Sequence, residues 1–133
     1  MAKKNVVLLE SDSPSTVVGV ASNDKIWKVC WNINQQLTLQ LASAEEDVTQ
    51  VKGPELYTDF DSDTDFDYFF FENSFKSNKV PKLARQFRYW LVIRPKKDRI
   101  PEVKGIVRAL TEIENISLAH DLTNEKDIKK LLP

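Results

Sequence analysis

The sequence predicts an α+β fold in which two main helices pack on one face of an antiparallel sheet. Three observations lead to this prediction. Residues 87–93 (FRYWLVI) form an almost unbroken apolar run, as expected of a central strand. Residues 26–37 and 103–110 instead carry apolar side chains at helical spacing. Residues 56–72 have the pattern of two strands around polar turn residues, which favours an antiparallel pair.

The N-terminal part is predicted to be a strand followed by a helix. Residues 16–21 (TVVGVA) are rich in β-branched side chains, and residues 22–24 (SND) offer side chains that could cap a helix. The expected helix has an apolar stripe formed by Ile26, Val29, Cys30, Ile33 and Leu37. Leu39 and Leu41 alternate across a glutamine, so we expect a short strand after the helix.

The middle of the chain is predicted to contain a hairpin and the central strand. Residues 44–53 are polar and end in a glycine that precedes a proline, which predicts a loop. Residues 56–60 and 67–72 are the expected arms of the hairpin. Residues 77–83 are irregular and end in a short helical turn, before the strand at 87–93.

The C-terminal part predicts a helix, a strand and a short last helix. Pro101 suits the first turn of a helix, and Asn115 ends that helix. The stripe expected to be buried is Val103, Ile106, Val107 and Leu110. Residues 116–119 predict a strand, and Asn124 would cap a helix over 125–132. The whole order is close to the ferredoxin-like βαββαβ pattern with extra strand material in the middle.

Length and composition predict a single domain, residues 1–133, in the cytoplasm. The chain is 41% hydrophobic and 29% charged, which is typical of a globular protein. Cys30 is its only cysteine, so an internal disulfide is excluded. No apolar stretch approaches the roughly 20 residues that span a bilayer, so we expect no membrane association. The apolar run at residues 6–9 is shorter than a signal peptide requires.

Charges of opposite sign are concentrated in different parts of the chain. Residues 45–72 contain ten acidic residues and one basic residue, whereas residues 76–108 contain eleven basic and two acidic residues. This division predicts a molecule with an acidic face and a basic face. The net charge of −1 gives no reason to expect a general nucleic-acid binder.

Residues 17–41 resemble the start of the small bacterial IPExxxDY family, in which a strand leads to a helix with an aromatic residue ahead of Leu-Asn. The counterparts here are Trp31 and the pair Ile33-Asn34. The family continues with Leu-Gly-Ile-x-Leu, matched by residues 37–41 with Thr38 in place of the glycine.

Three later segments, 66–79, 89–93 and 100–122, are similar to the family's strand and turn, its Tyr-Phe-Leu-Leu-Ile strand, and its closing helix and strand. Residues 80–82 (VPK) stand where the family has Ile-Pro-Glu, and residues 88–89 (RY) where it has Asp-Tyr. Both acids are bases here, so no role of those acids carries over. The resemblance implies the fold and a cytoplasmic location, and no activity.

An alternating series of aspartates is the one candidate metal site in the sequence. Asp61, Asp63, Asp65 and Glu72 occupy positions 1, 3, 5 and 12 of an EF-hand calcium loop. Phe66 stands at position 6, where the loop needs glycine, and the flanking segments are predicted strands. The other interpretation is a solvated hairpin tip, and we expect no bound cofactor.

Catalytic residues are not evident, so we expect a protein that is not an enzyme. His120 and Asp121 are neighbours on a predicted strand and would point to opposite faces. Cys30 lies on the apolar stripe of the first helix, where a buried and unreactive thiol is the usual outcome.

The first functional hypothesis is a binding or assembly module that forms a homodimer or takes a protein partner. Its candidate interface residues are Trp27, Trp31, Arg88, Trp90 and Arg94, because tryptophan and arginine are favoured at interface centres. Trp27 and Trp31 could instead both pack on the sheet.

Two further hypotheses come from other classes. The C-terminal strand–helix–strand, with Ile100 and Pro101 opening the helix, resembles an ACT-like domain that binds a small regulatory ligand. The basic segment 82–99, with Tyr89 and Trp90 as stacking residues, could bind nucleic acid.

Overall fold

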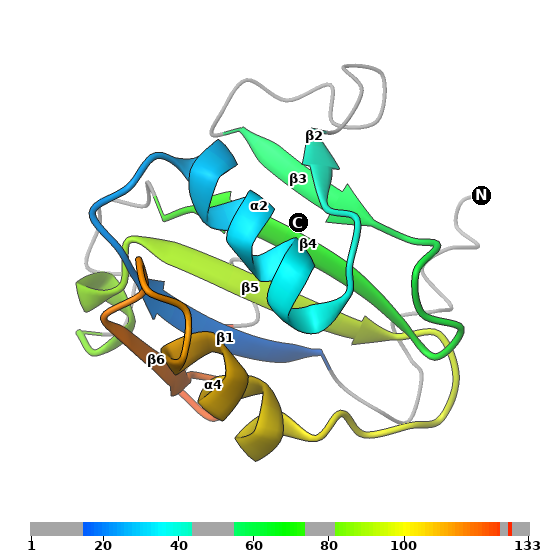
Figure 1. Ribbon diagram of the computed structural model, residues 1–133. Coiled ribbons are helices and arrows are strands. Elements are labelled where there is room, and N and C mark those ends of the chain that lie inside the picture. Colours follow the sequence, from blue (N-terminus) through cyan, green and yellow to red (C-terminus); the bar gives the residue numbers. More distant parts are fainter. Residues whose placement is uncertain (1–14, 44–54, 74–81, 126–127, 129–133) are drawn as a thin grey trace.

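In the part of the chain that the structure describes, an antiparallel sheet of six strands carries two helices, which confirms the predicted α+β class. The computed structural model describes residues 15–43, 55–73, 82–125 and 128 (Figure 1). The elements are β1 (Thr16–Ala21), α2 (Ile26–Leu37), β2 (Ala42–Ser43), β3 (Leu56–Asp59), β4 (Phe66–Glu72), a 3-10 helix (Ala84–Gln86), β5 (Tyr89–Pro95), α4 (Val103–Thr111) and β6 (Leu118–Asp121).

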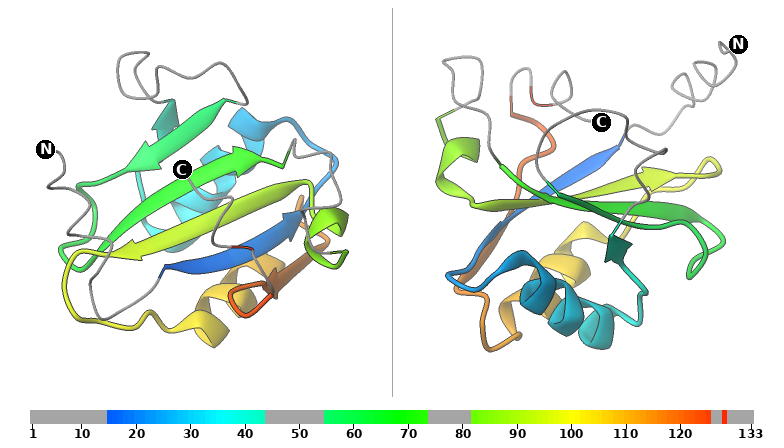
Figure 2. Two further views of the ribbon diagram at one scale, coloured as in Figure 1. Left: turned by 180° about the vertical axis from the view of Figure 1, so that it is seen from behind. Right: turned by 90° about the horizontal axis from the view of Figure 1, so that it is seen from above.

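The strand order is β2-β3-β4-β5-β1-β6, and all neighbouring strands are antiparallel. β5 lies in the interior of the sheet between β4 and β1, as its apolar sequence predicted. Both helices lie on the same face of the sheet, with α4 at the β6 edge (Figures 1 and 2). The N-terminal strand β1 is therefore enclosed by two strands from the last third of the chain.

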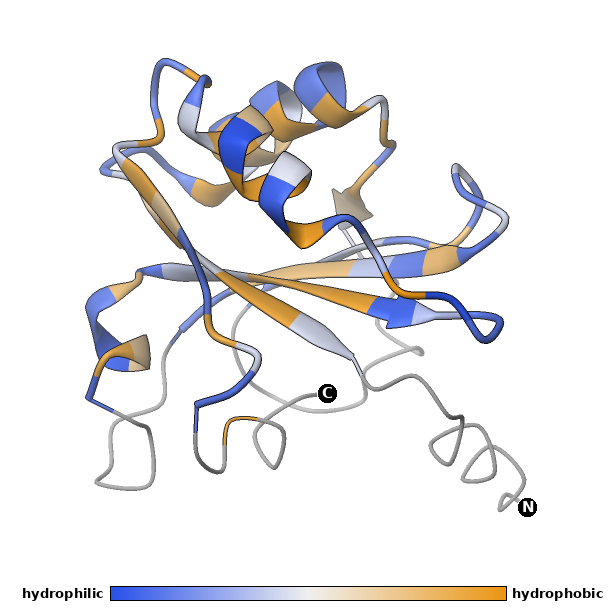
Figure 3. Cartoon of the chain, turned by 90° about the horizontal axis from the view of Figure 1, so that it is seen from below, coloured by the Kyte–Doolittle hydropathy of each residue, from blue (hydrophilic) through white to orange (hydrophobic). Residues whose placement is uncertain are grey.

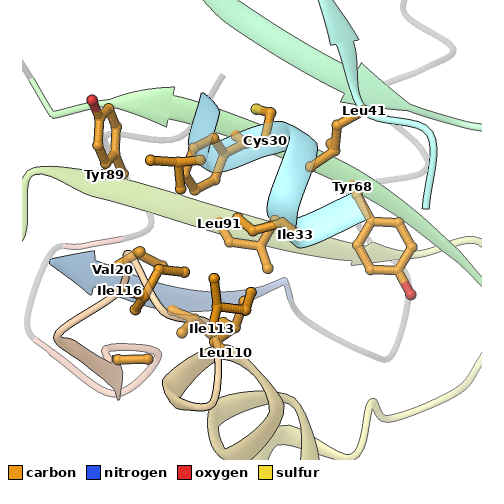
Figure 4. Packing of buried hydrophobic residues seen from close by; sticks show 14 of the residues in the cluster. Val20, Cys30, Ile33, Leu41, Tyr68, Tyr89, Leu91, Leu110, Ile113 and Ile116 are labelled. Atoms are coloured by element: carbon orange, nitrogen blue, oxygen red, sulfur yellow. The ribbon is translucent and has the colours of Figure 1, made fainter. Parts of the chain in front are cut away.

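The first hydrophobic core lies between the helices and the sheet (Figure 4). Tyr89 and Leu91 of β5 are fully buried there, together with Ile33 of α2 and Leu110 of α4. The Tyr89 ring stacks on Phe70 of β4 with centroids 5.3 Å apart. The buried stripe predicted for the first helix is thus the side that faces the sheet.

The second face of the sheet is covered by other parts of the same chain. Trp90 packs there against Phe87 and Leu122, and its indole N–H donates a hydrogen bond to the Ala84 carbonyl over 3.3 Å. Ile128 is also buried in this cluster. The central strands are accordingly hydrophobic along most of their length (Figure 3). Trp90, a candidate interface residue, lies in the core and not on a surface open to a partner.

The two ends of α2 differ from a standard capped helix. The N-cap is Lys25, whose side chain has no acceptor and makes no capping hydrogen bond. The hydroxyl of Ser22 accepts the N–H of Asp24 over 3.1 Å, before the helix begins. At the other end Thr38 adopts φ 58° and ψ 51°, a left-handed conformation that glycine adopts at far lower cost. The predicted capping by residues 22–24 is corrected accordingly.

Several predicted boundaries shift by a few residues. The short strand after α2 is β2, while the expected residues Leu39 and Leu41 are buried just before it. The second helix ends at Thr111 and not at Asn115, and the last strand is β6. The predicted loop 44–53, most of segment 77–83 and most of the predicted helix 125–132 lie outside the described residues.

Gly19 of β1 is required by close packing on the second face. A methyl group at this position would lie 2.5 Å from the Phe87 ring and 2.8 Å from a Leu122 methyl. These distances are far shorter than a van der Waals contact, so the ring of Phe87 must move to admit any side chain. Gly105 of α4, in contrast, has open space where a methyl group would be.

We expect Gly19→Ala to lower the free energy of unfolding by about 1–3 kcal/mol, the usual cost of overpacking a core. The matched variant Gly105→Ala should raise it by about 0.5–1 kcal/mol, because alanine favours the helix over the unfolded chain. Urea unfolding of both variants measures the two changes. Equal effects at the two sites would contradict the packing around Gly19.

The Asp59 carboxylate joins the turn after β3 to the loop after α2. It is buried and accepts the N–H groups of Asp61 and Ser62 over 3.0 Å each and that of Gln40 over 2.7 Å. Burial acts to raise the pKa of Asp59, but the hydrogen bonds from Ser62, Gln40 and Asp61 outweigh it and hold the pKa below its usual value.

We expect Asp59→Asn to lower the free energy of unfolding by about 1–3 kcal/mol at neutral pH, because a buried charged acceptor is lost. A lowered folded-state pKa means that the carboxylate stabilises the fold above its unfolded-state pKa. This contribution is lost as the pH falls through the folded-state pKa. Urea unfolding over this pH range should show the difference between wild type and variant shrinking with acidification.

Asp61→Asn is the control for this experiment, since the Asp61 side chain is exposed and the hydrogen bond to Asp59 comes from the Asp61 backbone. It should change the stability little at any pH. A loss in Asp59→Asn that stays the same at all pH values would show that the charge of Asp59 plays no part.

Candidate functional site

The outer side of α2 carries two exposed tryptophans, Trp27 and Trp31, which we call the tryptophan face. Their exposed fractions are 59% and 60%. Residues four apart lie on the same side of a helix, and the opposite side of α2 is buried against the sheet. Of the two interpretations that the sequence allowed, packing on the sheet is therefore excluded. Exposed apolar side chains grouped on a surface are typical of a contact site.

A hollow of about 480 Å³ lies beside Trp31, between the end of α2 and the loop that follows it. The Asn34 side chain holds this loop in place, because its Nδ2 donates to the Leu41 carbonyl over 3.1 Å and its Oδ1 accepts the Leu41 N–H over 2.8 Å. Asp59 fixes the same loop through Gln40. The loop that bounds the hollow is thus fixed by hydrogen bonds from two side chains, Asn34 on α2 and Asp59 at the end of β3.

A second hollow of about 770 Å³ lies between α4 and β6, and we call it the α4–β6 groove. Val103 and Val107 line it, although the sequence predicted that Val103, Ile106 and Val107 would be buried like Leu110. Leu110 alone of these four is buried. The other three are half-exposed because α4 lies over the edge of the sheet, where the described residues form no strand beyond β6.

The acidic hairpin tip lies against the basic loop after β5. Asp67 is 3.7 Å from Arg94 and 3.5 Å from Lys96, and Asp65 lies 4.0 Å from both Lys97 and Arg99. The antiparallel register causes this pairing, since it places Asp67 opposite Arg94. The predicted separation into an acidic and a basic face is therefore corrected: the two segments are neighbours and largely neutralise each other.

The two arginines proposed for an interface are both engaged with acids on β4. Arg88 is 3.3 Å from Glu72, and its guanidinium lies 5.0 Å from the centre of the Tyr89 ring. Arg94 pairs with Asp67 and lies 4.6 Å from the centre of the Phe69 ring. The structure does not bring these arginines together with the tryptophan face.

The four candidate metal ligands are also not brought together. Glu72 ends β4, so it lies roughly 20 Å along the strand from Asp65, at about 3.3 Å per residue. Asp63 accepts the N–H of Asp65 over 2.8 Å and the hydroxyl of Tyr68 over 3.0 Å. Among the residues that the structure describes, three or more potential metal ligands are nowhere grouped to hold an ion.

The two residues considered for catalysis lie in separate surroundings. Cys30 is buried in the first core, and burial followed by the charge of Glu55 raises the pKa of its thiol to about 12. The ring of His120 stacks on Phe87 with centroids 6.1 Å apart, while the Asp121 carboxylate accepts the N–H of Thr123 over 2.9 Å. Cys30 therefore stays protonated and unreactive at neutral pH.

Sequence reasoning named the two tryptophans but missed both hollows. The sequence singled out Asn34 only through the family resemblance. Its hydrogen bonds with Leu41 depend on the left-handed turn of the backbone at Thr38, which the sequence did not predict. The α4–β6 groove follows from the position of β6 at the edge of the sheet. The order of strands in a sheet leaves no local signal in a sequence.

Comparison with family models, with curated proteins and with solved structures finds no match to this chain. In the part of the chain that the structure describes, the helices are too short and too polar to cross a membrane. Two surfaces of the molecule remain as candidate binding sites, the tryptophan face with its hollow and the α4–β6 groove.

Proposed function

We propose that this protein is a non-enzymatic binding and assembly module that forms a homodimer through the tryptophan face. One observation carries the proposal: two exposed indoles and a hollow lie side by side on the same surface. Interface energy is concentrated where a large aromatic side chain enters a pocket of its partner. A surface that offers both is suited to pair with a copy of itself.

A two-fold axis between two protomers would let a tryptophan of each protomer enter the hollow of the other. Such an axis makes each contact occur twice, with the same residues exchanged between the protomers. If the two α2 helices run antiparallel across the axis, Trp27 of one protomer lies level with the end of α2 of its partner. It can then enter the hollow beside Trp31 of that partner.

The available area predicts a weak dimer. Two tryptophans that are about 60% exposed, each with up to about 250 Å² of surface, provide roughly 300 Å². A stable interface needs about 800 Å² on each partner. The remainder must come from polar neighbours such as Lys28 and Gln35, which are exposed on the same helix. We therefore expect dissociation in the micromolar range or above.

The second candidate function is an ACT-like domain that binds a small regulatory ligand. The α4–β6 groove favours it, because Pro101 lines the groove at the junction between β5 and α4, and small ligands bind in such hollows between elements. The groove is open along its length, whereas a small-ligand pocket encloses most of its ligand. The homodimer is therefore the preferred proposal.

Nucleic-acid binding through segment 82–99 is the third candidate. Five of its basic residues, Arg88, Arg94, Lys96, Lys97 and Arg99, lie within ion-pair distance of acids. Trp90, the expected stacking residue, is buried. These contacts leave less free positive charge and aromatic surface than a single-strand binder needs.

The finer description of the fold also belongs to this proposal. We infer a ferredoxin-like βαββαβ unit in strands β6-β1-β5-β4 with α2 and α4, to which β3 and β2 add the extra strand material. A relationship to the IPExxxDY family is supported at Thr38, whose left-handed backbone suits the glycine that the family carries there. This relationship implies that the chain comes from a bacterium and is located in the cytoplasm.

We expect the wild-type protein to sediment as a monomer–dimer mixture at micromolar concentrations, and Trp27→Glu and Trp31→Glu to sediment as monomers. A charge placed in the centre of the interface must be desolvated, so either substitution should abolish association. Tryptophan emission of the wild type should shift to the blue as concentration rises, because the exposed indoles leave water.

Ile100→Glu is the matched control, since Ile100 is 84% exposed and lies before α4, away from the tryptophan face. It should dimerise like the wild type. A wild-type chain that remains monomeric, or a dimer that tolerates both tryptophan substitutions, would contradict the proposal. Thermal unfolding of all variants checks that each is folded.

A further inference from the structure

The first turn of α2 carries a pair of opposite charges beside the tryptophan face. Asp24 precedes the helix and Lys28 lies one turn later, with 4.0 Å between the Lys28 ammonium and the Asp24 carboxylate. Both side chains are partly open to solvent. Lys28 and Trp31 are three residues apart and are hence neighbours on the helix surface. This pair therefore lies at the border of an interface that the tryptophan face forms.

A second pair of opposite charges lies at the end of α4. Arg108 and Glu112 are four residues apart, and both are exposed. Neither forms an ion pair with a residue that the structure describes. The Glu112 carboxylate is held beside α2, because it accepts a hydrogen bond from the side-chain amide of Gln36 over 3.3 Å. The end of α4 is therefore level with the end of α2.

The four charges alternate in sign along the axis of α2. The two helices run in opposite directions over the sheet (Figure 1). Since Glu112 is level with Gln36, Arg108 lies about 6 Å further along, beyond the last residue of α2, at about 1.5 Å per residue. The order along the axis is then Asp24, Lys28, Glu112 and Arg108. A copy of this series in the reverse direction presents the opposite sign at each position.

We propose that two copies of this chain pair with their α2 helices antiparallel, and that Asp24 and Lys28 of each protomer form ion pairs with the partner's Arg108 and Glu112. This rests on the proposed homodimer and adds the residues that fix its orientation. The reversed copy satisfies all four charges, and the symmetry of the dimer repeats each contact. Complementary charges of this kind set the register of an interface more than its affinity.

The position of the indoles and the position of the charges agree. With Trp27 level with the partner's Leu37, the last residue of α2, the two-fold axis brings Lys28 level with the partner's Gln36. The partner's Glu112 is held at that level by its contact with Gln36. The acid one turn before Lys28 and the arginine one turn before Glu112 both lie about 6 Å further along in the same direction, so they are level as well. One axial offset therefore suits both the indoles and the ion pairs.

The same symmetry brings the correct sides of the helices together. A two-fold axis that makes the α2 helices antiparallel lies between them and at right angles to them. The side of α2 that faces α4 in one protomer then meets the same side in its partner. A parallel pair, about an axis along the helices, would bring opposite sides together and leave the charges of α4 without a partner.

Other charges near these two pairs do not enter the contact. Lys25 lies two residues before Trp27, and residues two apart point to different sides of a helix. Lys104 lies one turn before Arg108, hence about 6 Å beyond it and past the start of the partner's α2. Glu55 is exposed and precedes β3, and β3 and α4 lie on opposite sides of α2 (Figure 1). Glu55 is therefore suited to a matched control.

Sedimentation equilibrium of charge variants tests the pairing. Lys28→Glu and Glu112→Lys each place like charges opposite one another at two symmetric positions, so each should weaken the dimer about tenfold. The double variant Lys28→Glu with Glu112→Lys restores opposite charges and should associate at least as tightly as the wild type. Glu55→Lys should associate like the wild type. Thermal unfolding checks that each variant is folded.

Cross-linking tests the orientation by a second route. In the antiparallel pair, two chains with Lys28→Cys have these positions about 12 Å apart along the helices, whereas Lys28→Cys in one chain and Gln35→Cys in the other are within about 2 Å of the same level. A short bismaleimide should therefore join the two variants in a mixture, and neither variant to itself. Cys30 is buried and should not react.

The outcomes separate this proposal from the dimer on which it rests. A double variant as weak as the single ones, an equal loss in Glu55→Lys, or cross-linking of Lys28→Cys to itself overturns the antiparallel arrangement and leaves the tryptophan dimer in place. A wild-type chain that stays monomeric at all concentrations overturns both.

Discussion

The burial of β5 on both of its faces is the constraint on which the rest of the structure depends. Tyr89, Leu91 and Ile93 need cover on one side, and Trp90 and Val92 need it on the other. Two helices satisfy the first requirement. The second is met by segments that have little regular structure, including Ala84, Phe87 and Leu122. Gly19 is a consequence, because covering groups can approach β1 closely only where no side chain projects.

This use of apolar residues decides which surfaces remain for other molecules. A chain of this size has few large apolar side chains beyond those that its cores bury, and most of its aromatic residues lie in the two cores. Trp27 and Trp31 are not needed by either core, which is why their exposure suggests a contact. The charged hairpin tip has the opposite character. Asp67 forms ion pairs with Arg94 and Lys96 across β4 and β5, so these charges hold two strands of the chain together and are not free to bind a ligand.

Local patterns predicted the elements, and long-range pairing decided the surfaces. The bounds of β1 and the buried stripe of α2 were evident from β-branched residues and helical spacing. The interior position of β5 followed from its apolar run. The burial of Trp90 was not predictable in the same way, because it depends on Leu122 and Ile128, which are distant in the sequence. The half-exposed valines of α4 and the pairing of Asp67 with Arg94 likewise depend on strand order and register.

The position of β1 between β5 and β6 has a consequence for biosynthesis. β1 leaves the ribosome before both of its partners, because β5 follows roughly seventy residues later and β6 later still. At about 5–20 residues per second, several seconds pass before either edge of β1 can be paired. During this interval a β-branched apolar strand is open to wrong partners. The segment around Val17 and Val18 therefore stays without its native partners until β5 and β6 have been synthesised, and this is the interval in which a chaperone would protect it.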